Sequence, residues 1–255
     1  MTGYLRQLRM ICAMGLACLL AGCSFISARF TRTDPVVLPA EVSDLPIVAV
    51  DPIDGEKDTR FAIWLSGDGG WGDMERQTTA LMARRGVPTA GVNTLRYFWD
   101  RRSPEEAARA VERIERAFSA RWRRSRFILI GFSFGADMAP LVAERLRPDV
   151  RAQLDSAVLL SPTLRASLQV SPRTWLGFGG EHNVEQTIAS LTSVPIVCAR
   201  GVKAAAAACP KTSKAGLRVV VLPGGHSLQD DWPMVAQLAL GRASADSHPI
   251  KLGNR

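Results

Sequence analysis

The sequence predicts an α/β protein built on a doubly wound, mostly parallel sheet with helices on both faces. Three observations lead to this fold class. Short apolar runs of strand length alternate along the chain with longer segments of helical periodicity. These runs are apolar throughout, which is typical of strands covered on both faces of a sheet. Finally, 255 residues with 47% hydrophobic composition suit one domain with a large core.

The first 22 residues have the pattern of an export signal. Arg6 and Arg9 precede the apolar run 10–21, which is short for a bilayer span and of the right length for a signal-peptide core. The run ends in the letters LAGC, which resemble a bacterial lipobox. We therefore expect residues 1–22 to be a lipoprotein signal peptide and Cys23 to carry the lipid. An ordinary signal peptide and a buried helix that contains a cysteine are the alternatives.

The residues after the cysteine predict a location and a domain layout. Ser24 resembles the outer-membrane sorting signal, so we expect a lipoprotein on the periplasmic side of the outer membrane. The inner membrane and the soluble periplasm are the less favoured locations. Residues 23–44 hold two prolines and no sustained periodicity, which indicates a tether. An α/β domain is expected at 45–242, and 243–255 are expected to form a disordered tail.

Within the domain, strands and helices are predicted from apolar runs and from helical periodicity. The clearest helix covers 104–122, where Ser103 is placed to cap it and Pro104 fits its first turn. The predicted strands are 46–50, 61–67, 87–93, 127–131, 156–161, 195–199 and 217–224. The other predicted helices are 73–85, 135–146, 184–193 and 231–242.

A candidate nucleophile lies where a predicted strand meets a predicted helix. The letters GFSFG place Ser133 between the strand at 127–131 and the helix at 135–146. A GxSxG in this context is the nucleophile elbow, in which two glycines let the chain turn sharply and expose the serine Oγ above the sheet edge. The alternative is an ordinary serine in a tight turn.

A serine hydroxyl needs a base, and His226 is the histidine best placed to be one. It follows the last predicted strand in the letters LPGGH, which is the chain order of an α/β-hydrolase triad. A histidine that only stabilises a turn is the alternative. His182 lies among glycines and His248 lies in the polar tail, so neither has comparable support.

Backbone amides for a developing oxyanion are expected from two places. One is the N–H of Phe134, directly after the candidate nucleophile. The other is the glycine-rich stretch LSGDGGW at 65–71, where Asp68 or Gly69 would donate. A phosphate-binding loop is the rival interpretation, but the spacing fits neither GxGxxG nor a Walker motif.

The cysteines and the net charge indicate a disulfide and argue against metal and nucleic-acid binding. With the signal removed and Cys23 lipidated, Cys198 and Cys209 remain, and an exported protein is expected to join them in a disulfide, with two free thiols as the alternative. No metal-ligand spacing is present, and no cofactor is expected.

The 32 basic and 24 acidic residues give a net charge of +8, but the arginines are dispersed among acids, which favours membrane proximity over nucleic-acid binding.

Several motifs together resemble the bacterial virulence protein family of VirJ and AcvB. This resemblance implies an exported α/β-hydrolase-like protein that hydrolyses aminoacylated phosphatidylglycerol, chiefly lysyl-phosphatidylglycerol, at the periplasmic face. It also implies type IV secretion components as partners, since some members are linked to that system and to virulence. The motifs, in order, are LSGDGGW, LRYFWDRRSPEEAA, LIGFSFGAD, WLGFGG, CARG before a second cysteine, and LPGGH.

Such a substrate carries ammonium groups, so carboxylates are expected in its pocket. Asp137, one turn after the elbow, and Asp68 match acidic positions in the family's motifs. The alternative role for Asp137 is to stabilise the N-terminus of its helix.

The chain departs from the family at the triad acid. In the family, the loop between the two cysteines carries acidic residues, whereas here it reads CARGVKAAAAAC, and 186–225 contain no Asp or Glu. The acid is therefore unassigned, and an enzyme without it would be slowed by about 10⁴. A Ser133–His226 dyad and a protein that binds without turnover are the alternatives to an acid elsewhere. The candidates for that acid are Glu181, Glu185, Asp230 and Asp231.

Three functions remain open at this point. The first is a lipid-anchored serine hydrolase of aminoacyl-phosphatidylglycerol, and the second is a serine esterase that acts on another exported ester. The third is a non-catalytic binding or scaffold protein that assists a secretion system.

Overall fold

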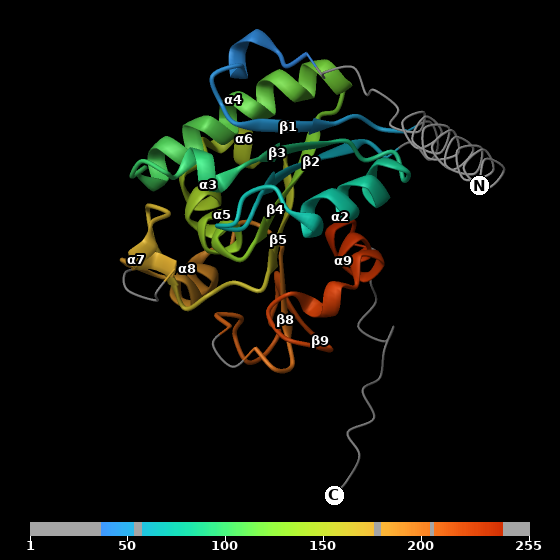
Figure 1. Cartoon of the computed structure of the whole chain (residues 1–255). Helices are drawn as coiled ribbons and strands as arrows, with labels where there is room; N and C mark the ends of the chain where they lie inside the picture. Colours follow the sequence, from blue (N-terminus) through green and yellow to red (C-terminus); the bar gives the residue numbers. More distant parts are fainter. Residues whose placement is uncertain (1–36, 54–57, 176–179, 205–206, 242–255) are drawn as a thin grey trace, which may run out of the picture. The chain divides into compact units, whose positions relative to one another are not determined.

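The central feature of the fold is a seven-stranded sheet in the order β1-β3-β2-β4-β5-β8-β9 (Figure 1). The computed structural model describes residues 37–53, 58–175, 180–204 and 207–241. All neighbouring strands are parallel except β1, which is antiparallel to β3. The doubly wound, mostly parallel sheet predicted from the sequence is therefore confirmed. The strands are β1 (Ile47–Val50), β2 (Arg60–Leu65), β3 (Thr89–Val92), β4 (Arg126–Phe132), β5 (Leu154–Leu160), β8 (Ile196–Gly201) and β9 (Leu217–Leu222).

Five predicted helices connect these strands, and several short elements were not predicted. The predicted ones are α2 (Asp73–Ala83), α4 (Pro104–Trp122), α5 (Phe134–Arg145), α8 (Val184–Ser190) and α9 (Trp232–Ala239). Elements of two to four residues are too short to show a period in the sequence. They are η2 (Ala40–Val42), α3 (Thr94–Tyr97), α6 (Pro148–Arg151), β6 (Arg165–Ala166), α7 (Pro172–Trp175), β7 (His182–Asn183) and η3 (Leu228–Asp230).

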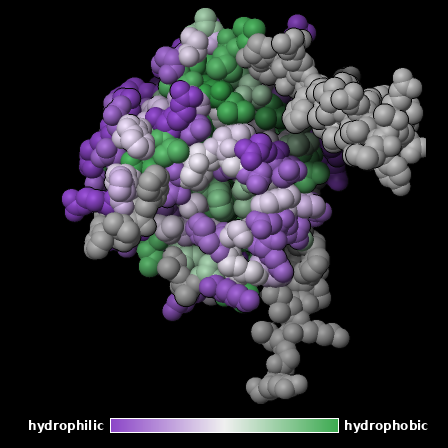
Figure 2. Space-filling model, viewed as in Figure 1, coloured by the Kyte–Doolittle hydropathy of each residue, from purple (hydrophilic) through white to green (hydrophobic). Residues whose placement is uncertain are grey.

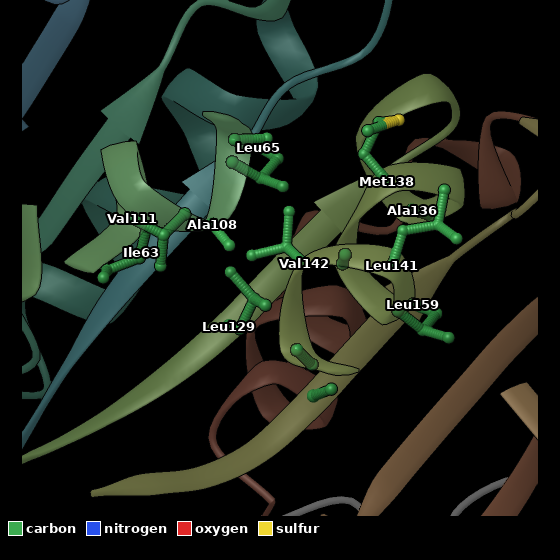
Figure 3. Packing of buried hydrophobic residues seen from close by; sticks show 14 of the residues in the cluster. Ile63, Leu65, Ala108, Val111, Leu129, Ala136, Met138, Leu141, Val142 and Leu159 are labelled. Carbon is green, nitrogen blue, oxygen red and sulfur yellow. The ribbon is translucent and has the colours of Figure 1, made fainter. Parts of the chain in front are cut away.

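The helices cover both faces of the sheet, because successive side chains of each strand point to opposite faces. On β2, Phe61, Ile63 and Leu65 join the core beneath α4 and α5, whereas Ala62 and Trp64 join the core beneath α2 and α9. Figure 3 shows the first core, with side chains of α4 and α5 packed on β2, β4 and β5. Full burial of one such large apolar side chain stabilises the fold by about 1.5–3 kcal/mol.

Helix α4 begins where the sequence predicts it. The Ser103 Oγ accepts a hydrogen bond from the Glu106 N–H at 3.2 Å, and the Glu106 carboxylate accepts one from the Ser103 N–H at 2.8 Å. This reciprocal pair satisfies two N–H groups that the helix leaves without partners. The cap and the proline after it therefore fix the first residue of α4.

The segment before β1 is packed on the domain. Residues 38–44, which the sequence analysis assigns to the tether, include η2, and Val42 within it is fully buried in the core next to α4. Asp44 accepts hydrogen bonds from the Arg113 guanidinium of α4. The expected signal peptide at 1–22, the Cys23 lipid site and the expected tail at 243–255 lie outside the described residues. Within the described part, no helix combines the length and the hydropathy needed to cross a bilayer.

A disulfide joins Cys198 of β8 to Cys209 in the loop that follows. The loop it closes also pairs with the segment after β5, through the Thr163–Ala207 bridge and a hydrogen bond of 3.1 Å from the Ala208 N–H to the Pro162 carbonyl. The disulfide thus closes a loop in which Ala207 and Ala208 lie against residues 162–163.

Replacing both cysteines by alanine (C198A/C209A) is expected to lower the free energy of unfolding by about 3 kcal/mol, because it frees a loop of this length in the unfolded chain. Urea unfolding of the two proteins under oxidising conditions measures the difference. Reductant should destabilise the wild type and leave the variant unchanged, and equal stability of the two oxidised proteins would contradict the assignment.

Candidate active site

Ser133 occupies a strained turn between β4 and α5, with φ of 52° and ψ of −117°. The two flanking glycines have no room for a side chain. A Cβ on Gly131 would lie 2.2 Å from the Gly135 carbonyl oxygen, and a Cβ on Gly135 would lie 2.1 Å from the Leu65 carbonyl oxygen. Such contacts are impossible for any residue other than glycine. The GxSxG spacing therefore reflects a physical constraint, and the predicted elbow is the observed geometry.

His226 meets Ser133 at hydrogen-bonding distance. Its Nε2 lies 2.8 Å from the Ser133 Oγ, within the range expected of a nucleophile and its base. The loop after β9 reaches this position by passing close to β8, where a Cβ on Gly201 would lie 2.1 Å from the Gly225 carbonyl oxygen. The imidazole also contacts the Phe132 ring, with centroids 5.5 Å apart.

The surroundings of His226 favour its neutral form. His226 is exposed as a residue, and its ring contacts the Phe132 ring and the Ser133 Oγ. Partial burial of the imidazole lowers the pKa of His226, and the negative charge of Asp68 opposes the shift. A neutral imidazole can accept the serine proton at neutral pH.

None of the four residues named as candidate triad acids is hydrogen-bonded to His226 in the described part of the chain. Glu181 forms a bidentate ion pair with Arg101, both contacts being 2.7 Å. Asp231 caps α9 by accepting a hydrogen bond from the Met234 N–H. Glu185 and Asp230 are exposed on α8 and η3.

The carboxylate whose charge acts on His226 is that of Asp68. Sequence reasoning placed Asp68 in the oxyanion loop and at a substrate ammonium, and it looked for the acid after the nucleophile in the chain. The loop after β2 and the loop after β9 lie apart in the sequence, so only the fold shows that Asp68 comes near the base.

Ser133 opens into a pocket of about 370 Å³. Its walls include Asp68 from the loop after β2, Asp137 from α5, and Thr163 and Arg165 from the segment after β5. Both carboxylates predicted to bind an ammonium group therefore line the same pocket as the candidate nucleophile.

Asp137 lines this pocket and is almost fully buried. Its two carboxylate oxygens accept hydrogen bonds of 2.6 Å from the N–H and the Oγ1 of Thr163. Burial raises the pKa of Asp137 well above its usual value, the Thr163 hydrogen bonds oppose the rise, and the charge of Asp68 adds to it. Asp137 thus ties the segment after β5 to α5, and it would gain from a cation in the pocket.

The amides expected to form an oxyanion site lie at the first residue of α5 and on the glycine-rich loop after β2. Phe134 is the first residue of α5, so its N–H has no acceptor within the helix. Among the described residues, no hydrogen-bond acceptor is found for the N–H groups of Asp68 and Gly69. The arrangement leaves these amides available to a substrate oxygen.

Two residues that sequence reasoning missed hold this loop. Glu75 of α2 is buried, and its carboxylate accepts hydrogen bonds from the N–H groups of Gly67 at 3.2 Å and Gly72 at 2.9 Å. The Thr94 Oγ1 donates to the Gly67 carbonyl at 2.7 Å. Glu75 stands three residues after Gly72, the spacing of a capping box, and that signal could have identified it.

The pH dependence of Ser133 reactivity tests this electrostatic arrangement. We expect the rate of labelling by a fluorophosphonate to fall as the pH drops through the pKa of His226, because only the neutral imidazole accepts the proton. Since Asp68 raises that pKa, Asp68→Asn should move the acidic limb of the profile to lower pH. Asp149→Asn, on α6, is the charge-matched control and should leave the limb in place. A limb that moves to higher pH in Asp68→Asn would contradict the account.

The fold is shared with solved α/β-hydrolases. A protein assigned as a dienelactone hydrolase from Klebsiella pneumoniae superimposes with a TM-score of 0.57 at 16% identity, over 80% of this chain and 93% of that one. Est1E from Butyrivibrio proteoclasticus gives 0.55 at 14% identity, over 77% and 93%. An α/β serine hydrolase homologue from Coxiella burnetii gives 0.53 at 15% identity, over 78% and 91%. At these identities the likeness shows the α/β-hydrolase fold.

The family follows from the sequence. Among curated proteins, none matches this chain. Residues 59–246, most of the chain, match the family of the bacterial virulence protein VirJ. This stretch contains the elbow, the glycine-rich loop, both cysteines and His226, and it confirms the resemblance found in the motifs. The chain therefore belongs to the VirJ family of bacterial virulence proteins.

Proposed function

We propose that this protein is an exported, lipid-anchored serine hydrolase that cleaves the aminoacyl ester of aminoacyl-phosphatidylglycerol, with lysyl-phosphatidylglycerol as its main substrate. The observation that carries the proposal is the 2.8 Å contact between the Ser133 Oγ and the His226 Nε2, where Ser133 lines a pocket together with Asp68 and Asp137. Anchoring through Cys23 at the periplasmic side of the outer membrane belongs to the same proposal.

The reaction proceeds by acyl transfer to Ser133 and then to water. The Ser133 Oγ attacks the ester carbonyl and His226 takes its proton, while the N–H groups of Phe134 and of Asp68 or Gly69 stabilise the oxyanion. The ester bond breaks, and the glycerol oxygen of the lipid leaves with the proton held by His226. A water molecule, deprotonated by His226, then hydrolyses the aminoacyl-serine and releases the amino acid.

The two carboxylates of the pocket, Asp68 and Asp137, support a cationic acyl group, although the Arg165 guanidinium also lines the pocket. The two carboxylates lie beside the nucleophile, and a bound ammonium would favour the ionised form of Asp137 against the burial that raises its pKa. A neutral acyl group would gain nothing from these carboxylates.

Among the described residues, His226 would act as the base without a hydrogen-bonded acid. Removal of only that acid from a triad costs about 10⁴ in rate and leaves catalysis above that of water. The Asp68 charge stabilises the imidazolium that forms during the reaction, although it does not fix the tautomer as a bonded acid would. We therefore expect a slow hydrolase.

The same observation favours a second candidate function. With no carboxylate bonded to His226 in the described residues, the pocket suits a non-catalytic protein that binds a cationic group and assists a type IV secretion system. A serine esterase that acts on another exported ester is the third candidate.

Covalent labelling separates an enzyme from a binding protein. We expect a fluorophosphonate to label the wild type at Ser133, and labelling to disappear in Ser133→Ala and fall at least 100-fold in His226→Ala, because the base is lost. Ser167→Ala removes another hydroxyl at the same pocket and should label like the wild type. Labelling that persists in Ser133→Ala would exclude Ser133 as the nucleophile.

Lysine release from purified lysyl-phosphatidylglycerol in detergent identifies the substrate. We expect release by the wild type and none by Ser133→Ala. Asp68→Asn should raise KM more than it lowers kcat, because the ammonium contact exists in the ground state as well. Wild-type protein that is labelled at Ser133 and yet releases no lysine would point to a different ester.

A further inference from the structure

A second cavity lies beside α3 and the beginning of α4. Its volume is about 410 Å³, and it shares no lining residue with the Ser133 pocket. The LRYFW motif at 95–99 contributes Arg96 and Tyr97 to its wall, and the active-site chemistry makes no use of either residue.

The lining of this cavity carries more positive than negative charge. Formal charges sum to +2, because four guanidinium groups face two carboxylates. In the view of Figure 2, hydrophilic residues are interspersed with hydrophobic ones over α3 and the adjoining part of α4. The arginines are Arg96, Arg102, Arg109 and Arg113, and the acids are Asp44 and Glu106.

Part of this cavity is held rigidly by contacts among its own residues. Arg113 is fixed by the Asp44 carboxylate and the Glu41 carbonyl. The Arg102 guanidinium lies over the Tyr97 ring, 5.6 Å from its centroid, and the Tyr97 hydroxyl donates to the Glu106 carbonyl at 3.2 Å. These contacts set the shape of the wall before any ligand arrives.

Arg96 and Arg109 are different, because their side chains have no ion pair or hydrogen bond with any described residue. Both side chains are exposed at the cavity. An arginine without an internal partner keeps all its donors for a ligand, and the planar guanidinium matches the oxygens of a phosphate in a bidentate manner.

The cavity and the Ser133 pocket lie at the same edge of the sheet. The carboxyl end of β3 is paired with that of β2, and β2 is paired in turn with the end of β4 that leads to Ser133. Helix α3 begins two residues after β3, and residues 44–46, which precede β1, also line the cavity. An anionic group bound here would lie on the side of the molecule that carries the pocket.

We infer that this cavity binds a phosphate group, with the guanidinium groups of Arg96 and Arg109 as its direct ligands. Such a group is found in the phosphodiester headgroup of an anionic phospholipid and in free inorganic phosphate. The site is separate from the proposed catalytic pocket and does not depend on its activity.

Calorimetric titration of the full chain in neutral detergent tests the site. One arm uses glycerophosphoglycerol, the headgroup of phosphatidylglycerol without acyl chains, and the other uses inorganic phosphate. We expect the double variant R96Q/R109Q to bind at least tenfold more weakly than the wild type. R84Q/R85Q, at the exposed end of α2, removes the same charge elsewhere and should bind like the wild type.

The outcomes distinguish a lipid headgroup from free phosphate as the ligand, and a specific site from an effect of net charge. Preference for glycerophosphoglycerol assigns a lipid headgroup, and preference for inorganic phosphate assigns the free ion. Equal weakening in both double variants would show that only net charge matters and would overturn the proposal, as would the absence of binding by the wild type. Thermal unfolding of both variants, expected to match the wild type, shows that lost binding is not lost folding.

Discussion

The candidate active site depends on one close backbone approach, between the start of α5 and the end of β2. Because Gly135 has no side chain, the start of α5 can lie directly against the end of β2. A Cβ on Gly135 would collide with the Leu65 carbonyl oxygen. This approach brings Ser133 beside the glycine-rich loop that follows β2, where a Cβ on Gly67 would lie 3.6 Å from the Ser133 Cβ. Glu75 and Thr94 then hold the loop by hydrogen bonds to Gly67.

Electrostatics at the site centres on Asp68 and Asp137. Asp68 affects two titrating groups, since its charge raises the pKa of both His226 and Asp137. A cation bound between the carboxylates would relieve the repulsion that they exert on each other. In the proposed function, Asp68 therefore has two roles: it binds the substrate ammonium together with Asp137, and its charge supports His226 as the base.

Much of this arrangement was predictable from the sequence, and the rest was not, for physical reasons. Strands buried on both faces read as continuous apolar runs, and chain order placed Ser133 and His226 at one edge of a parallel sheet. The short elements β6 and β7 have too few residues to show a period. The proximity of Asp68 to His226 could not be predicted, because it depends on how two loops distant in sequence meet above the sheet.

The central claim is that Ser133 carries the aminoacyl group during turnover. Rapid acid quench of the protein mixed with lysyl-phosphatidylglycerol, followed by peptide mass spectrometry, tests it most directly. The account predicts one lysyl group on the peptide that contains Ser133, absent from Ser133→Ala and lost from the wild type as lysine is released. Lysine release by Ser133→Ala at the wild-type rate, or a lysyl group on another residue, would contradict it.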